Sequence, residues 1–157
     1  FRFFLCKKIE HMKQFIFFSD DSWAALILRL TLGIIMLPHG ARKMFGLYGG
    51  YGFRLTMDYF TRQMNLPAVL AGLIILTELM GSICLIIGFA SRLFAFLFLA
   101  IMAGAILTTN YKNGLFMNWS GNQKGEGFEY HLLVIGICIC LLFTGSGKYS
   151  TDGLIIR

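Results

Sequence analysis

Residues 93–111 read LFAFLFLAIMAGAILTTNY and contain no charged side chain. A bilayer core requires about 20 mostly apolar residues per helix, and no helix of a soluble domain needs such a run. Similar runs begin near Trp23, Pro67 and Leu132. We therefore predict an all-α protein, a polytopic membrane four-helix bundle with spans at residues 23–44, 67–88, 92–110 and 129–145.

Composition supports one membrane domain. The chain has 157 residues, of which 57% are hydrophobic and 14% charged, whereas soluble domains carry about 25% charged residues. Four spans with short connections leave no room for a soluble catalytic domain. We expect an N-terminal segment (1–22), a membrane domain (23–147) and a C-terminal tail (148–157). Met12 also offers a start, so residues 1–11 are either an upstream extension or a fragment boundary.

The net charge of +6 does not indicate nucleic-acid binding. The basic residues flank the apolar runs, with Lys7, Lys8 and Lys13 before the first and Arg42 and Lys43 after it. Such placement is typical of side chains that anchor helices among lipid headgroups. The expected partner is the lipid bilayer, and the charge balance between the two faces leaves the orientation open.

The cysteines do not form a redox or metal motif. Cys138 and Cys140 are two residues apart, which separates their side chains by about 200° around a helix. Disulfide chemistry on a helix needs a CxxC pair instead. The sequence also lacks a metal-ligand pattern, so we predict no metal site.

A short amphipathic helix is predicted between the first two spans. Apolar residues recur there at spacings of four, three and four, while charged residues fall on the other side. The apolar positions are Phe53, Met57, Phe60 and Met64, and the charged ones are Arg54, Asp58 and Arg62. A structureless loop is the alternative, but the periodicity favours an interfacial helix.

Two charged residues lie inside predicted spans. Arg29 is about 9 Å from the start of the first span, and Glu78 is about 15 Å from the same membrane face. A charge buried alone in lipid costs several kcal/mol, so each needs a partner. We predict a buried Arg29–Glu78 ion pair between the first two spans. Its role is either to fix helix register, which we favour for Arg29, or functional, which stays open for Glu78.

A second polar group is predicted near the opposite membrane face, where the ends of three spans meet. It combines hydrogen-bond donors, an acceptor and two imidazoles. Its members are His39, Lys43, Tyr111, Glu129 and His131. These residues could hold a quinone headgroup, which needs hydrogen bonds at two carbonyl oxygens. Lys43 and His131 equally fit interfacial residues that reach water, whereas we favour a functional role for His39.

The same residues carry a family likeness. The chain resembles the DoxX family of small four-helix membrane proteins over residues 25–152. The likeness rests on the order and spacing of several short motifs, which are Arg29-Leu30-x-Leu32-Gly33, Pro38-His39-Gly40-x-x-Lys43, Leu66-Pro67, Glu78-Leu79-Met80-Gly81, Gly88-x-x-x-Arg92, Met102, Gly127-x-Glu129 and Gly145-x-Gly147-x-x-Ser150-x-Asp152. His131, directly after Glu129-Tyr130, departs from the usual pattern.

The resemblance implies four membrane helices and a loose link to redox chemistry, because relatives include the membrane subunit of a thiosulfate–quinone oxidoreductase. We therefore expect a multi-pass protein of a bacterial cytoplasmic (inner) membrane, acting as an oxidoreductase subunit with a soluble or membrane redox partner. The sequence has no haem, flavin or iron–sulfur motif and so no cofactor of its own is evident, and redox chemistry would need either a bound quinone or the cofactor of a partner protein. The alternative is a non-catalytic membrane scaffold or a small-solute carrier.

Overall fold

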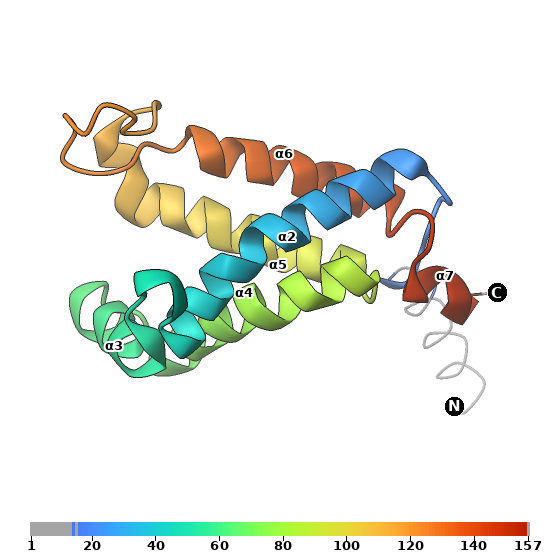
Figure 1. The fold of residues 1–157 in the computed structure, drawn as a ribbon, viewed down its shortest axis with the longest axis horizontal. Coiled ribbons are helices and arrows are strands. Elements are labelled where there is room, and N and C mark those ends of the chain that lie inside the picture. The colour runs from blue at the N-terminus through green and yellow to red at the C-terminus, as the bar shows by residue number, and fades with distance from the viewer. Residues whose placement is uncertain (1–13, 15, 157) are drawn as a thin grey trace, which may run out of the picture.

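The protein folds into a bundle of long helices (Figure 1). The structure is a computed structural model that describes residue 14 and residues 16–156, so the alternative start at Met12 lies outside the described residues. Within that part of the chain no strand occurs, and the predicted all-α fold class is confirmed. The long helices are α2 (Trp23–Phe45), α4 (Ala68–Ile87), α5 (Ser91–Ala105) and α6 (Glu129–Thr144). The shorter elements are η1 (Leu47–Gly49), α3 (Gly52–Asp58), η2 (Tyr59–Gln63), η3 (Ile106–Asn110), η4 (Tyr111–Asn113) and α7 (Thr151–Ile156).

Local sequence signals set the helix ends. Ser22 caps α2, because its hydroxyl oxygen accepts hydrogen bonds from the backbone N–H groups of Ala24 and Ala25. Gly46 and Gly88 end α2 and α4 in the left-handed conformation that glycine adopts at low cost. Helix α4 begins directly after Pro67, whose fixed φ suits the start of a helix.

Three helical stretches are long and apolar enough to cross a membrane. They are Trp23–Phe45, Ala68–Ile87 and Ser91–Asn113, the last of which combines α5, η3 and η4. Helix α6 is equally apolar but has only 16 residues. These helices agree with the predicted membrane bundle.

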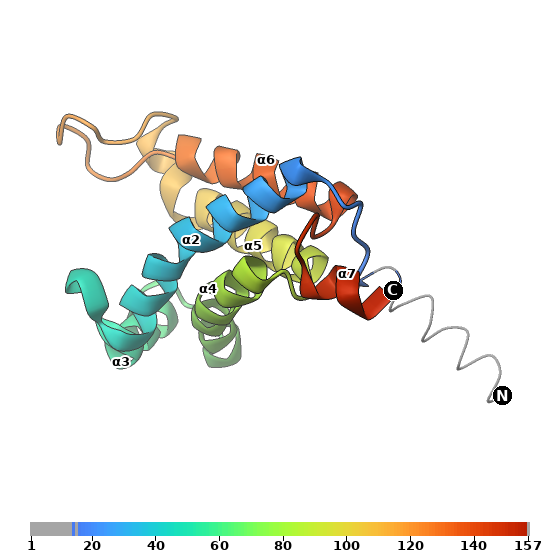
Figure 2. The ribbon, with the colours of Figure 1, turned by 45° about the vertical axis from the view of Figure 1, so that its right-hand side comes forward.

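The bundle consists of two tightly packed helix pairs. Helix α2 packs mainly on α4, and α5 packs mainly on α6, as Figures 1 and 2 show. Glycines allow the first pair to approach closely, since a Cβ atom on Gly40 would lie 2.5 Å from the backbone nitrogen of Leu79. A core common to both pairs includes Leu32, Leu85, Phe98 and Leu141.

The predicted amphipathic helix is present as α3 and the π-helical turn η2, at the left-hand end in Figure 1. Met57, Phe60 and Met64 pack against Ala71 and Ile75 of α4. The charged side is exposed, and there Arg62 and Asp58 form an ion pair at 3.6 Å. The segment therefore covers the end of the α2–α4 pair.

The C-terminal tail closes the opposite end of the bundle, where Figure 2 shows α7. Asp152 is fully buried. Its carboxylate accepts hydrogen bonds from the backbone N–H groups of Ala90 at 2.7 Å and Ser91 at 3.0 Å, at the start of α5, and from the Ser146 hydroxyl. One side chain thus ties the tail to the α4–α5 turn.

Candidate functional site

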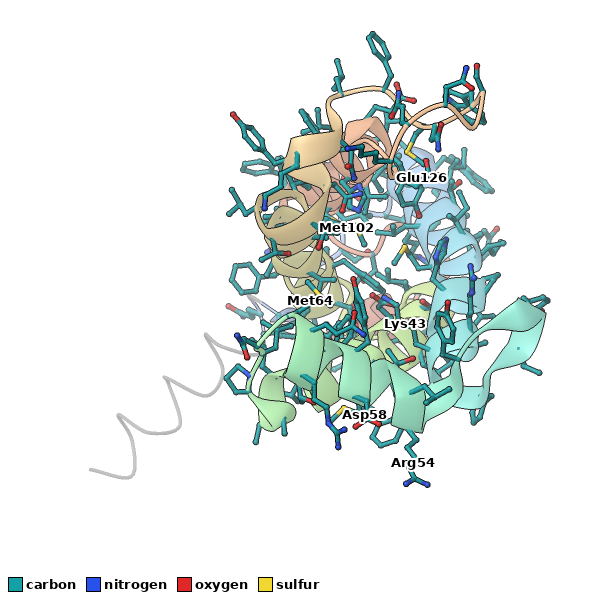
Figure 3. All side chains as sticks on the ribbon, turned by 90° about the vertical axis from the view of Figure 1, so that its left-hand side faces the viewer. Lys43, Arg54, Asp58, Met64, Met102 and Glu126 are labelled. Atoms are coloured by element: carbon teal, nitrogen blue, oxygen red, sulfur yellow. The ribbon has the colours of Figure 1, made fainter. Side chains whose placement is uncertain are left out.

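An ion pair between α2 and α4 lies at the centre of the candidate site. The Lys43 Nζ atom lies 2.5 Å from Glu78 Oε1. The side chain of Glu78 is 2% exposed and that of Lys43 is 31% exposed. The pair therefore joins a carboxylate buried in the bundle to a cation that reaches toward the surface. Figure 3 shows Lys43 inside the molecule behind α3, whereas Arg54 points outward.

A cavity of about 760 Å³ lies between the end of α2 and the α3–η2 segment. This volume is within the range of ligand pockets in proteins, roughly 300–1,000 Å³. Its wall combines polar and aromatic side chains. The lining residues are His39, Arg42, Lys43, Tyr51, Leu55, Thr56, Asp58, Tyr59, Phe60, Arg62 and Gln63.

Positive charge predominates at the cavity. Arg42, Lys43 and Arg62 line it, and Asp58 is the acidic residue in its wall. Lys43 also lies over the ring of Phe60, 5.7 Å from the ring centroid. Electron-rich ligand atoms such as carbonyl or phenolate oxygens are therefore favoured in this cavity over cations.

A row of rings continues from the cavity toward α6. The rings of His39 and Tyr130 are stacked with centroids 6.1 Å apart, and the rings of Tyr130 and His131 meet edge-on at 5.7 Å. The Tyr130 hydroxyl donates to the sulfur of Met36 at 3.3 Å. His131 joins this row through the ring of Tyr130 and does not itself line the cavity. Three of the predicted site residues, His39, Lys43 and His131, are thus brought together.

Two buried polar atoms of this cluster have unused hydrogen-bonding capacity. Glu78 Oε2 and His131 Nδ1 are buried and have no hydrogen-bond partner among the described residues. Buried polar atoms in native proteins are nearly always paired with protein, water or ligand. Both atoms therefore have capacity for a further hydrogen bond in the side chains that adjoin the cavity, although neither residue lines it.

The prediction that Arg29 and Glu78 form an ion pair is wrong, because each residue has other partners. Both residues are buried, with 1% exposure each, but Glu78 pairs with Lys43. The Arg29 guanidinium donates to five backbone carbonyl oxygens instead. The acceptors are those of Ser146 at 2.7 Å, Leu85 at 2.9 Å, Ile86 at 2.6 Å, Lys148 at 3.0 Å and Tyr149 at 2.7 Å.

Helix register explains this correction. Gly40 of α2 lies against the backbone of Glu78 and Leu79 in α4. Arg29 is eleven residues before Gly40, which corresponds to about 16 Å along a helix. The guanidinium therefore lies beside Gly88, at the end of α4, and the residue level with Glu78 that can offer a cation is Lys43.

Glu129 and Tyr111 occupy other positions than predicted. Glu129 Oε1 accepts hydrogen bonds from the Met117 backbone N–H at 2.9 Å and the Trp119 indole N–H at 3.1 Å. It therefore orders the preceding loop. Tyr111 is 70% exposed in η4, and neither residue lines the cavity.

Sequence reasoning missed several residues of the site. Tyr130 lies between Glu129 and His131, and its ring position between two histidines depends on how α2 faces α6. Tyr51 and Tyr59 line the cavity, although they are not on the apolar face that revealed the amphipathic helix. Among the described residues, no cluster of three or more His, Cys, Asp or Glu side chains could hold a metal ion.

Comparison with known proteins places the chain in a family. The DoxX family profile matches residues 24–111. The chain is 33% identical over 132 residues to "Putative oxidoreductase CatD" of Bacillus subtilis (strain 168), covering 84% of this chain and 87% of that protein. It is 29% identical over 131 residues to "Inner membrane protein YqjF" of Escherichia coli (strain K12), covering 83% and 90% respectively. No solved structure matches significantly. The chain belongs to the DoxX family of membrane proteins.

Proposed function

We propose that this DoxX-family protein is the membrane subunit of a quinone-linked oxidoreductase and binds a quinone headgroup in the cavity between α2 and α3–η2. The observation that carries the proposal is the Lys43–Glu78 pair beside that cavity, with the second carboxylate oxygen of Glu78 buried and unbonded. The name of the Bacillus relative, "Putative oxidoreductase CatD", agrees with this role. The name of the Escherichia relative supports a bacterial inner membrane location.

The residues present fit a quinone headgroup. A quinone is a flat ring with two carbonyl oxygens, which accept hydrogen bonds. Lys43 has three ammonium N–H donors, of which Glu78 accepts one, so two remain for a ligand oxygen. Tyr51, Tyr59 and Phe60 supply aromatic surface against which a ring can pack.

The chain's own residues can also exchange protons at the site. When bound, a quinone would accept two electrons and two protons. The carboxylate of Glu78 can hold a proton at its unbonded oxygen, next to the Lys43 ammonium. His39 is exposed and lines the cavity, so its imidazole can exchange protons with water. Lys43 and His39 both line the cavity, and Lys43 contacts the buried carboxylate of Glu78.

The electrons must come from another protein. The sequence lacks motifs for haem, flavin or iron–sulfur clusters, so a redox partner with its own cofactor would supply two electrons per quinone. We propose a soluble or membrane redox protein as this partner. The cavity lies at one end of the bundle, beside the interfacial helix α3, which is the end where such a partner could approach.

A membrane scaffold is the second candidate, and the closed end of the bundle favours it over a carrier. Arg29 and Asp152 are both buried and bind backbone groups across that end. A small-solute carrier requires access from both membrane faces. A scaffold requires only rigidity, which these bonds supply.

Quinone titration separates the two candidates. We would purify the protein in mild detergent, remove lipids, and measure binding of a water-soluble short-chain quinone by equilibrium dialysis. Losing the hydrogen bond from a charged donor costs about 1.5–3 kcal/mol, or about 10- to 100-fold in affinity. Lys43→Gln and Glu78→Gln should weaken binding by about that factor. Lys112→Gln, at an exposed lysine outside the cavity, should bind like the unmodified protein.

A scaffold would show no saturable quinone binding, or the same affinity in Lys43→Gln, Glu78→Gln and Lys112→Gln. Either result would contradict the proposal. His39→Gln guards against loss of folding, because His39 is exposed and its replacement leaves the buried ion pair intact. We expect weaker binding in this variant with unchanged thermal stability.

A further inference from the structure

The loop before α6 exposes apolar side chains at the end of the bundle that carries the cavity. We call residues 114–128 the Trp119 loop. Within it Leu115 is 42%, Phe116 68% and Trp119 86% exposed. Figure 3 shows Glu126 of this loop and Arg54 of α3 on opposite sides of that end. Large apolar side chains gathered on one exposed loop indicate an interaction surface.

Hydrogen bonds hold the Trp119 loop in one conformation, and this conformation exposes its apolar side chains. Besides the two bonds to Glu129, the carboxylate of Glu126 accepts from the Asn118 backbone N–H at 2.9 Å. The backbone carbonyl of Glu126 accepts from the side-chain amides of Asn110 at 2.9 Å and Asn113 at 3.0 Å. These bonds fix Trp119 with its indole N–H bonded and its ring outward.

The length of α6 indicates what covers these side chains. Its 16 residues correspond to about 24 Å, whereas the hydrocarbon core of a bilayer is about 30 Å thick. The loop joins the start of this short helix directly, because the backbone N–H of Glu129 donates to the carbonyl of Leu115 at 2.9 Å. Apolar side chains next to the start of α6 can therefore extend its apolar length by the missing 6 Å or so.

We infer that the Trp119 loop lies in the headgroup layer of the bilayer, with Leu115, Phe116 and Trp119 at the boundary of the acyl chains. Tryptophan is enriched at this depth because its ring is apolar and its N–H is polar. Lys112 and Lys124 flank the apolar positions and are exposed, so they complement lipid phosphates. This inference does not depend on quinone binding.

Tryptophan fluorescence tests the inference, because the chain has only two tryptophans. Trp23→Phe leaves Trp119 as the only emitter, and Trp119→Phe leaves Trp23 at the start of α2 as the comparison. Each variant is placed in phosphatidylcholine–phosphatidylglycerol vesicles with and without lipids brominated near the headgroup. We expect the brominated lipids to remove more than half of the Trp119 emission, and aqueous iodide to remove less than it does from a free tryptophan derivative.

A surface that instead binds a soluble partner would remain in water in these vesicles. Trp119 would then lose less than half of its emission to brominated lipids and would be quenched by iodide like the free derivative, which would overturn the inference. Glu129→Gln in the Trp23→Phe background tests whether the hydrogen bonds to Glu129 hold the Trp119 loop in its conformation. Weakening two bonds to Glu129 should change the quenching of Trp119, whereas Trp23 emission in the Glu129→Gln/Trp119→Phe variant should stay unchanged.

Discussion

Arg29 shows how a charge can be buried in this bundle without an ion-pair partner in contact. Its five N–H donors match five backbone carbonyl oxygens from the end of α4 and the C-terminal segment. These carbonyls lie at the end of α4 and in the segment before α7, where helical N–H donors run out, although the Leu85 carbonyl also accepts from the Gly88 N–H at 3.2 Å. The five hydrogen bonds therefore satisfy the donors of Arg29 and, at the same time, backbone acceptors at this end of the bundle.

Replacing Arg29 should destabilise the protein strongly. Arg29→Met leaves up to four backbone carbonyl groups without a donor, since Leu85 keeps the bond from Gly88, and we expect a loss of about 3–5 kcal/mol in the free energy of unfolding. The free energy of unfolding of Arg29→Lys should lie between those of Arg29→Met and the unmodified protein, because an ammonium has three donors rather than five. Unfolding by sodium dodecyl sulfate in mixed micelles, followed by circular dichroism, measures both.

Arg54 offers the matched control, since it is exposed on α3 and points outward. Arg54→Met should stay within about 0.5 kcal/mol of the unmodified protein. An Arg29→Met variant as stable as Arg54→Met would contradict the role assigned to the carbonyl cluster.

At the scale of elements, the contact between α2 and α4 sets the register of the site. A Cβ atom on Gly40 would meet backbone atoms of Glu78 and Leu79 at 2.5–2.7 Å. Backbone atoms cannot move aside as a flexible side chain can. The close approach is therefore what brings Lys43 within reach of Glu78.

Gly40→Ala should separate the two helices and weaken the ion pair. Overpacking a core contact costs about 1–3 kcal/mol, and we expect a loss of stability in that range. Gly72→Ala is the control in α4, because a Cβ there meets no atom within 4 Å. Alanine should be neutral or stabilising there by up to about 1 kcal/mol. Thermal unfolding in one detergent compares the variants, and equal losses in both would contradict the register argument.

The sequence was sufficient to predict the helices but not their register. Long apolar runs and the periodicity of the amphipathic helix depend only on residues near one another in the chain, and these predictions agree with the structure. The partners of Arg29 and Glu78 depend instead on which glycine of α2 meets α4. Depth counted from a membrane face does not contain that information, and the backbone carbonyls that bind Arg29 have no signature in the sequence.

The candidate site was predictable in part for the same reason. His39, Lys43 and His131 were found because the ends of alternating spans meet at one face. Glu129 was assigned to the same site by depth, but its carboxylate binds the loop that precedes it. Loop conformation decides that contact, and no periodic pattern predicts it.

At the scale of the whole molecule, the two ends of the bundle differ. One end is closed by Arg29, Asp152 and the C-terminal segment. The other carries the cavity, the Lys43–Glu78 pair and the Trp119 loop. This asymmetry suits a protein that receives a ligand from one membrane face and holds it beside a buried carboxylate.

Photo-crosslinking in membranes can locate the quinone site on the protein. An azido-substituted quinone is bound to the protein in membranes, illuminated, and its adducts are mapped by mass spectrometry with an excess of unlabelled quinone as competitor. Quinone binding in this cavity predicts competed adducts on the cavity wall, in residues 51–63 and near His39 and Lys43. Adducts confined to the lipid-facing side of α4, or adducts that the competitor does not reduce, would contradict it.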